Sequence, residues 1–265
     1  MALSPLLADY DHLLLDLDGC VWVGDQATPR AREALAEIRG AGKTISFVTN
    51  DAALAPEEYV RKLWSLGLQA SLEEIVSVGA AIQYTLADRT PGTPTFVIGS
   101  PAIFRHVADA GQRIVNNTDR APEAQIVVVA GHDRFSFDEL RTATQAVLAG
   151  AEMIAAGRDR TFPAADGTSP GTGALVAALE YTTGHTALSV GKPDPIMFET
   201  ALDRLGPGRT LVVGDSLDAD LAGAVRAGLD GAIVLTGVTT RAQADAASDP
   251  APVAVAENLY SLVAA

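Results

Sequence analysis

The chain has 265 residues, which favours one large or two modest domains, and its 48% of apolar residues excludes a disordered chain. Nineteen basic and thirty-three acidic side chains give a net charge of −14, which disfavours nucleic acids and anionic membranes as partners. The single cysteine, Cys20, excludes an internal disulfide and fits a reducing compartment. Neither an apolar run of ~18 residues nor a signal peptide at Met1–Tyr10 is found, so we expect a cytoplasmic protein.

Strands and helices are predicted to alternate along the whole chain. A strand at His12–Leu17 is followed by a helix at Pro29–Arg39, a strand at Thr44–Val48 and a helix at Pro56–Leu66, which begins with Pro-Glu-Glu. Later strands are predicted at Thr95–Ile98, Ile126–Ala130, Met153–Ala155, Leu211–Val213 and Ala232–Leu235. Later helices are predicted at Ala102–Ala110, Ser136–Ala149, Thr172–Tyr181, Pro195–Leu205 and Asp218–Ala227. This alternation predicts an α/β fold with a parallel sheet that is covered by helices on both faces.

Two carboxylates follow the first predicted strand, in the sequence Asp16-Leu17-Asp18-Gly19. Residues i and i+2 of an extended segment point the same way, at the end of the sheet where parallel sheets bind ligands. Two such charges repel each other by roughly 1–4 kcal/mol at about 4 Å, and a divalent cation would relieve that repulsion. The pattern fits either a cation and phosphate site or a solvated Asp/Gly turn.

Two further segments offer groups that suit a phosphate. Thr49-Asn50-Asp51 follows the second strand, where a hydroxyl and free N–H groups could bind phosphate oxygens, or could form only a polar turn. Lys192 lies between Gly191 and the stiff segment Pro193–Pro195, which would hold its ammonium in place, although a surface lysine is the alternative.

A second acidic group follows the predicted strand Leu211–Val213, in the sequence Gly214–Asp220. Asp215 lies at the tip of the strand, and Asp218 and Asp220 lie where a helix begins. One or two of these acids could be helix caps, but three carboxylates in six residues favour a cation site with oxygen ligands, which suits Mg²⁺.

The order of these motifs, D-x-D-G, T-N, K-P and G-D-x-x-x-x-D, resembles that of the haloacid dehalogenase-like superfamily of phosphotransferases. Segments such as Phe47–Asn50, Gly67-Leu68 and Pro170–Gly173 are similar to the NagD-like and p-nitrophenylphosphatase-like branch. The resemblance implies a doubly wound, Rossmann-like parallel-sheet core made of residues 1–78 and 185–265. It also implies an inserted α/β cap of the C2 type, residues 79–184, that determines substrate specificity.

The resemblance implies the roles of the site residues in a phosphatase of small phosphate monoesters. Asp16 would attack phosphorus and carry a transient aspartyl-phosphate, and Asp18 would protonate the leaving alcohol and then accept a proton from water. Thr49, the Asn50 backbone and Lys192 would bind the phosphate, and the positive charge of Lys192 would also serve catalysis.

The resemblance likewise implies Mg²⁺ as the cofactor. The ion would be held by the Asp16 side chain, the Asp18 backbone carbonyl and Asp215, with support from Asp220 and Asp218.

This chain departs from the family pattern at two places. Asp51 puts a negative charge where relatives commonly have Asn or Ser, and Ala156-Gly157-Arg158-Asp159 replaces a stretch that often contains Ala-Thr-Asn-x-Asp. An arginine offers a planar fork of donors, so we expect Arg158 to bind an acceptor-rich group of the substrate, with Asp159 as the residue that orients it. The alternative is a solvent-exposed ion pair.

Two other functions are alternatives to the phosphatase. A signalling receiver module also uses an acid pair, a hydroxyl and a lysine, but it has about half this length. A catalytically weak protein that only binds a phosphorylated metabolite would not require Asp16, Asp18, Lys192 and Asp215 together. The substrate stays open among pyridoxal phosphate, phosphoglycolate, glycerol phosphate and nucleotides, and relatives suggest a homodimer formed through the cap.

Overall fold

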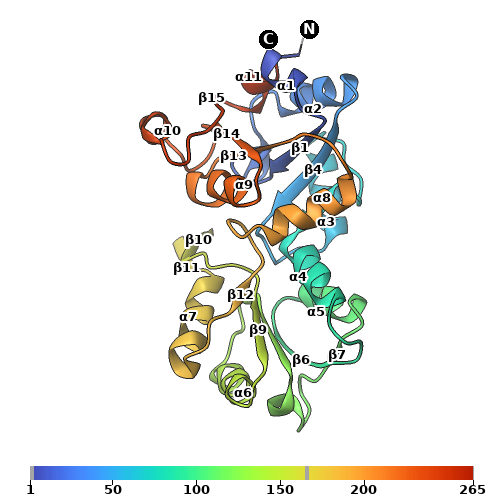
Figure 1. The fold of residues 1–265 in the computed structure, drawn as a ribbon, viewed down its shortest axis with the longest axis vertical. Helices are drawn as coiled ribbons and strands as arrows, with labels where there is room; N and C mark the ends of the chain where they lie inside the picture. Colours follow the sequence, from blue (N-terminus) through green and yellow to red (C-terminus); the bar gives the residue numbers. More distant parts are fainter. Residues whose placement is uncertain (1–2, 165–166, 265) are drawn as a thin grey trace. The chain divides into compact units, whose positions relative to one another are not determined.

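The computed structural model describes residues 3–164 and 167–264 and divides them into two compact units (Figure 1). Unit 1 contains the chain up to Thr49, Pro56–Ser77 and the chain from Lys192 onward, and unit 2 contains Asn50–Ala55 and Val78–Gly191. The predicted boundary at residues 78 and 79 lies one residue beyond the observed one. The second predicted boundary, between residues 184 and 185, lies seven residues before the observed boundary between Gly191 and Lys192. The reason is that Leu188–Ser189 forms a strand of the sheet in unit 2.

Unit 1 is built on a six-stranded parallel sheet in the order β15-β14-β13-β1-β4-β5. Its strands are β1 (His12–Asp16), β4 (Thr44–Thr49), β5 (Ile75–Ser77), β13 (Thr210–Gly214), β14 (Asp230–Val234) and β15 (Ala254–Ala256). A small antiparallel hairpin follows β1 and consists of β2 (Trp22–Val23) and β3 (Gln26–Ala27). Every residue of β1 is buried, as expected for a central strand with both faces covered.

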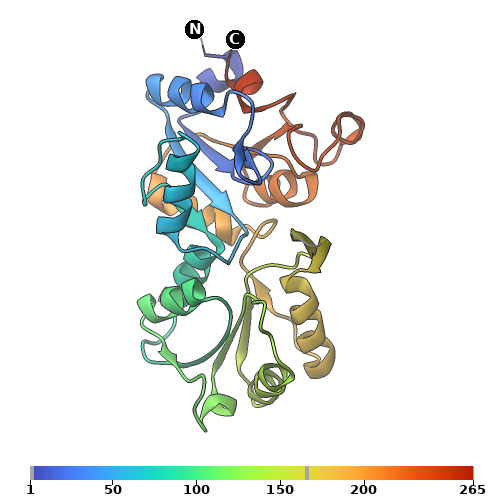
Figure 2. The same ribbon diagram turned by 180° about the vertical axis from the view of Figure 1, so that it is seen from behind.

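Helices cover both faces of this sheet. Figure 1 shows α8 and α9 on the near face, and Figure 2 shows α2 and α3 on the opposite face. The helices of unit 1 are α1 (Pro5–Ala8), α2 (Ala31–Gly40), α3 (Pro56–Ser65), α8 (Ile196–Leu205), α9 (Ala222–Arg226), α10 (Arg241–Ala246) and α11 (Leu259–Val263), with a π-helical turn η2 (Leu217–Leu221). The prediction of a doubly wound parallel sheet is confirmed.

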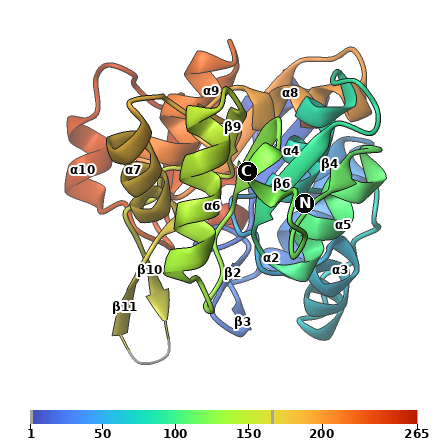
Figure 3. The same cartoon turned by 90° about the horizontal axis from the view of Figure 1, so that it is seen from below.

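Unit 2 has its own five-stranded parallel sheet in the order β12-β9-β8-β6-β7. Its strands are β6 (Pro94–Ile98), β7 (Arg113–Ile114), β8 (Ile126–Val129), β9 (Glu152–Ala155) and β12 (Leu188–Ser189). Its helices are α4 (Val78–Ala87), α5 (Pro101–Asp109), the short 3₁₀ helix η1 (Ala121–Glu123), α6 (Phe137–Leu148) and α7 (Thr172–Thr183). An antiparallel hairpin of β10 (Thr161–Ala164) and β11 (Gly167–Pro170) lies beside α7 (Figure 3).

Alternate residues of these strands form one core with α6 and α7. Phe96 and Ile98 of β6, Val127 and Val129 of β8 and Met153 of β9 all belong to it, as the two-residue period of a strand requires. Helix α6 begins with a complete capping box, in which Ser136 and Glu139 satisfy each other's backbone N–H groups.

None of the helices in residues 3–164 and 167–264 has the length and apolarity needed to cross a lipid bilayer.

Candidate active site

The site lies in unit 1, at the carboxyl ends of three adjacent strands. Asp16 is the last residue of β1, Thr49 is the last residue of β4, and Asp215 directly follows β13. Because β1 lies between β13 and β4, the topology brings all three residues to the same edge of the sheet. The structure therefore places together three residues that are far apart in the sequence.

Lys192 is the positive centre of this edge. Its ammonium donates to Asp16 Oδ1 at 2.5 Å and to Asp220 Oδ1 at 2.7 Å, and only 4% of the residue is exposed. A weaker contact joins Nζ to the Val48 carbonyl oxygen at 3.5 Å. The alternative of a solvated surface lysine is excluded.

Asp215 and Asp220 are held by the backbone of the segments around them. Asp215 Oδ2 accepts the Val238 N–H at 2.6 Å, and Asp220 Oδ2 accepts the Ser216 N–H at 3.0 Å. Ser216 caps η2, the π-helical turn that presents Asp220. A Cβ atom at Gly19 would collide with the Asp215 carboxylate, so the glycine of D-x-D-G is required by close approach as well as by its φ of +84°.

Three carboxylates meet at this edge, and their donor set fits a divalent cation. Asp16, Asp215 and Asp220 each offer an oxygen, and these oxygens lie within 4.8 Å of one another. All three residues are buried, and Lys192 supplies one positive charge against three negative ones. Two negative charges are left to be balanced, and hard oxygen ligands suit Mg²⁺. Asp218 is exposed and is not part of this cluster.

The electrostatics of the cluster favour protons or a cation on its carboxylates. Burial raises the pKa of Asp16 well above its ordinary value, while Lys192 opposes that rise and Asp220 adds to it. Burial also raises the pKa of Asp215, against the hydrogen bond from Val238. For Lys192, burial lowers the pKa, but the two neighbouring carboxylates more than compensate and raise it, so the ammonium stays charged.

Mg²⁺ is therefore expected to stabilise the folded protein, and to do so more at pH 8 than at pH 5. A folded-state carboxyl pKa that is raised contributes stability at low pH, which is lost as the pH rises through the folded value. In the metal-free protein, ionisation of the Asp16 and Asp215 carboxyls at higher pH removes this contribution to stability. A bound cation offsets that loss. At 100 times Kd the gain is about 2.7 kcal/mol, or roughly 5–10 °C in Tm for a chain of this size. Calorimetry in Mg²⁺ and in EDTA at both pH values measures the shift, and equal Tm values in all conditions would contradict it.

Asp18 is separate from the carboxylate cluster. Its side chain is exposed, and Oδ1 accepts the indole N–H of Trp22 at 2.7 Å. Trp22 is not predictable as a site residue from the sequence, because an aromatic residue in a short strand is typical of a core.

Asn50 belongs to unit 2, where its Oδ1 lies beside Gly191.

Arg158 and Asp159 lie in unit 2, after β9, and the structure shows what they contact. The guanidinium of Arg158 forms a two-point ion pair with Glu180 of α7, at 2.7 and 3.1 Å, and also donates to the Ala187 carbonyl at 3.0 Å. The backbone carbonyl of Asp159 accepts the Gly173 N–H. The ion pair lowers the pKa of Glu180 and links α7 to the segment that leads into β12. These contacts favour a structural role for Arg158, with Glu180 as an ion-pair partner.

We expect Arg158→Ala to lower the stability of the protein slightly and to leave substrate preference unchanged. The pair is partly exposed, so the cost is about 0.5–1 kcal/mol. kcat/KM should change by the same factor for glycerol phosphate and for p-nitrophenyl phosphate. A loss confined to glycerol phosphate would instead support the leaving-group role that the sequence predicts.

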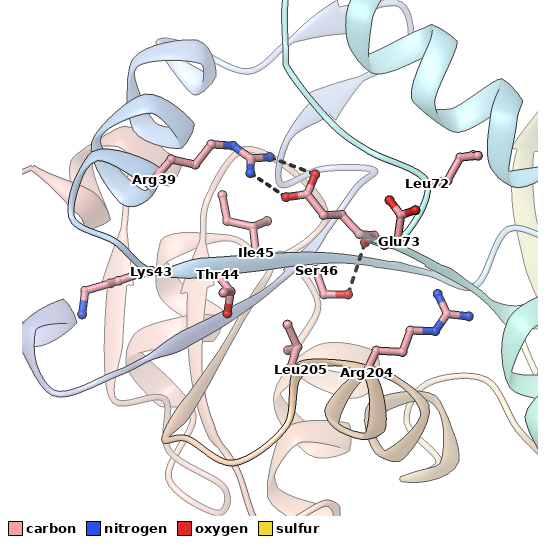
Figure 4. A pocket seen from close by; sticks show the side chains of 10 residues that line it. Arg39, Lys43, Thr44, Ile45, Ser46, Leu72, Glu73, Arg204 and Leu205 are labelled. Carbon is pink, nitrogen blue, oxygen red and sulfur yellow. Dashed lines mark hydrogen bonds and ion pairs between the residues drawn. The ribbon is translucent and has the colours of Figure 1, made fainter.

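A groove of about 690 Å³ lies elsewhere in unit 1, at the amino end of β4 (Figure 4). Three cationic side chains line it, and each is already engaged by the fold. Arg39 pairs with both oxygens of Glu74, Lys43 donates to the Tyr10 carbonyl, and Arg204 donates to the Ile75 carbonyl at 2.8 Å. The reactive groups lie at the other end of β4, so the groove is not the active site.

The chain matches the haloacid dehalogenase-like hydrolase family over residues 13–113 and a second, HAD-like hydrolase model over residues 189–262. It is 35% identical to human chronophin over 92% of this chain and 88% of that protein. It is 36% identical to the D-glycerol 3-phosphate phosphatase of Mycobacterium tuberculosis over 90% of this chain and 66% of that protein.

A solved structure, the p-nitrophenyl phosphatase from Archaeoglobus fulgidus, superimposes with a TM-score of 0.88 and 31% identity, covering 96% of this chain and 98% of that one. The glycerol phosphate phosphatase from M. tuberculosis, crystallised with magnesium, gives a TM-score of 0.87 and 35% identity over 96% of this chain and 77% of that one. The chain belongs to the haloacid dehalogenase-like hydrolase family, in its NagD-like branch, and is not a receiver module.

Proposed function

We propose that this protein is a Mg²⁺-dependent phosphatase that hydrolyses small phosphate monoesters through an aspartyl-phosphate on Asp16. The observation that carries the proposal is the buried Asp16 carboxylate at the end of β1, paired with Lys192 and next to Asp215 and Asp220. Relatives that align over most of the chain are named as phosphatases, which supports the same reaction class.

The chain's own residues account for each step of the proposed reaction. Asp16 attacks phosphorus in line with the departing oxygen, which splits one difficult displacement into two easier ones. Asp18 donates a proton to the leaving oxygen and then accepts one from the water that hydrolyses the phosphorylated Asp16. Lys192, Thr49 and the Asn50 backbone bind the phosphoryl oxygens, where negative charge accumulates.

Mg²⁺ is the proposed cofactor, because the carboxylate cluster fits a small divalent cation. The Asp16 and Asp215 side chains and the Asp18 backbone carbonyl would hold it, with Asp220 and, more distantly, Asp218 in support. When bound, the ion supplies positive charge to the phosphoryl group and to the attacking carboxylate.

The proposed substrates are small phosphorylated metabolites. The aligned relatives include a D-glycerol 3-phosphate phosphatase and sugar phosphatases, and these names support an aliphatic phosphate ester. Release of inorganic phosphate by the purified protein tests the proposal. The panel would contain glycerol 3-phosphate, sugar phosphates, phosphoglycolate, pyridoxal phosphate and nucleoside monophosphates. Turnover that stops in EDTA is expected, while saturable binding without turnover would favour a metabolite-binding protein instead.

We also propose a cytoplasmic homodimer that associates through the cap. The single free thiol, on the buried Cys20, supports a reducing compartment. Phe137, Leu148 and Tyr181 are large apolar side chains of unit 2 with more than half of their surface exposed, which supports an interface there. Sedimentation velocity of the purified protein tests the dimer, and a monomer at all concentrations would contradict it.

A further inference from the structure

The side chain of Trp22 makes one polar contact that has no part in the reaction as proposed above. Its indole N–H donates to Oδ1 of Asp18 at 2.7 Å. The tryptophan is 1% exposed, whereas Asp18 is exposed. A buried ring thus directs its single polar atom at the carboxylate that faces solvent.

The backbone of Trp22 is hydrogen-bonded to the loop that connects it to Asp18. The backbone N–H of Trp22 donates to the Leu17 carbonyl at 3.0 Å, and the backbone carbonyl of Trp22 accepts the Gly19 N–H at 2.7 Å. Trp22 also pairs with Ala27 in the hairpin β2–β3 (Figure 3). On its face, the Lys62 ammonium of α3 lies 4.4 Å from the ring centre.

An indole nitrogen is a donor and never an acceptor. Oδ1 of Asp18 must therefore act as an acceptor toward Trp22, whether Asp18 is protonated or ionised. A carbonyl oxygen accepts a hydrogen bond better than a hydroxyl oxygen, so the contact favours Oδ2 as the oxygen that carries a proton on Asp18. The contact thus orients the carboxyl group and favours Oδ2 as the oxygen that exchanges the proton.

We propose that Trp22 is a positioning residue that orients Asp18 for proton transfer at the leaving oxygen, an inference that rests on the acid–base role proposed for Asp18. In the first step, the Asp16 carboxylate forms a bond to phosphorus while the ester P–O bond breaks, and the proton on Asp18 Oδ2 passes to the departing oxygen. In the second step, Oδ2 takes a proton from water as the water oxygen bonds to phosphorus and the Asp16–phosphorus bond breaks.

The Trp22→Phe variant tests this role with two substrates that differ in leaving group. Glycerol 3-phosphate releases an alkoxide unless it is protonated, whereas p-nitrophenyl phosphate releases a stabilised phenolate that needs little protonation. kcat/KM reports only the steps up to departure of the leaving group, so the shared hydrolysis step does not affect the comparison. We expect kcat/KM to fall roughly 10–100-fold for glycerol 3-phosphate, part of the 10²–10⁴ that general acid catalysis supplies, and only about 3-fold for p-nitrophenyl phosphate.

Trp64→Phe is the matched control, because Trp64 is the second tryptophan of the chain and lies in α3 of the same unit. Its indole N–H donates to the Ala70 carbonyl at 2.8 Å, and it is 57% exposed. This variant should leave kcat/KM unchanged for both substrates. If Trp22→Phe does not fold, the sulfur analogue of tryptophan, which lacks the N–H, replaces Trp22 in the Trp64→Phe background, with the same expected result.

Equal losses of kcat/KM on both substrates, or no loss on either, would overturn the positioning role. Asp18→Asn separates that outcome from a failure of the proposed function. If Asp18→Asn turns over glycerol 3-phosphate normally, the acid–base role itself is wrong. If Asp18→Asn is inactive toward it while Trp22→Phe affects both substrates alike, only the role of Trp22 is wrong.

Discussion

Asp16→Asn is expected to lower kcat by at least ~10³-fold for every substrate, because the nucleophile and one metal-binding carboxylate are removed together. The substitution changes the volume of the side chain little, and the buried site should keep its packing. Burial raises the pKa of the Asp16 carboxyl, so its charge is unfavourable in the folded state, and Tm in EDTA at neutral pH should not fall.

Two measurements together check this expectation. Steady-state kinetics give the loss of kcat, and calorimetry shows whether the fold is kept. Asp25→Asn is the control, since Asp25 is exposed in the turn between β2 and β3 and should leave both quantities unchanged. An Asp16→Asn protein with activity within tenfold of the original would rule out Asp16 as the nucleophile.

Lys192→Met is expected to damage both stability and catalysis. The substitution leaves Asp16 and Asp220 buried without their positive partner, and breaking a buried pair in this way costs about 3–5 kcal/mol. Loss of a charge aimed at the phosphoryl group should also lower kcat by roughly 10²–10³-fold. In EDTA the destabilisation should be smaller at pH 5 than at pH 8, because protonation neutralises part of the unpaired carboxylate charge.

Urea unfolding at the two pH values measures the stability change, and phosphate release measures the catalytic one. Lys43→Met is the matched control, because Lys43 lies in the same unit and its ammonium donates to the Tyr10 carbonyl, far along β4 from the site. Comparable stability losses for the two variants would mean that the buried charge network does not stabilise this fold.

Local sequence patterns were sufficient to predict several strands and helices of unit 1, including the strand that ends in Asp16. The apolar run after Asp11 predicts β1 to within one residue, and the Pro-Glu-Glu start predicts α3. Helix α4 was missed because seven of its ten residues are buried, which leaves no polar face to reveal a helical period. Strands β5 and β12, of three and two residues, are too short for any periodicity to show.

The boundary between the units could not be predicted from composition. The chain passes directly from β5 into α4, between Ser77 and Val78, without the glycine or proline that marks a linker. The acidic and basic residues of the site were predicted as separate motifs, but their pairing was not. Lys192 contacts Asp16, 176 residues away, and Arg158 contacts Glu180, and such pairings are set by topology rather than by spacing.

The arrangement of the core sheet has a consequence for how the chain is made on the ribosome. The central strand β1 needs β13 as a neighbour, so it stays unpaired on that edge until residues 210–214 have been synthesised. The sheet of unit 2, in contrast, is complete once Ser189 has emerged. Because a domain folds as a unit when its residues become available, the nascent chain can finish its inserted unit first. Asp16 is then joined by Asp215 and Asp220 in one carboxylate cluster only after residue 220 has been synthesised.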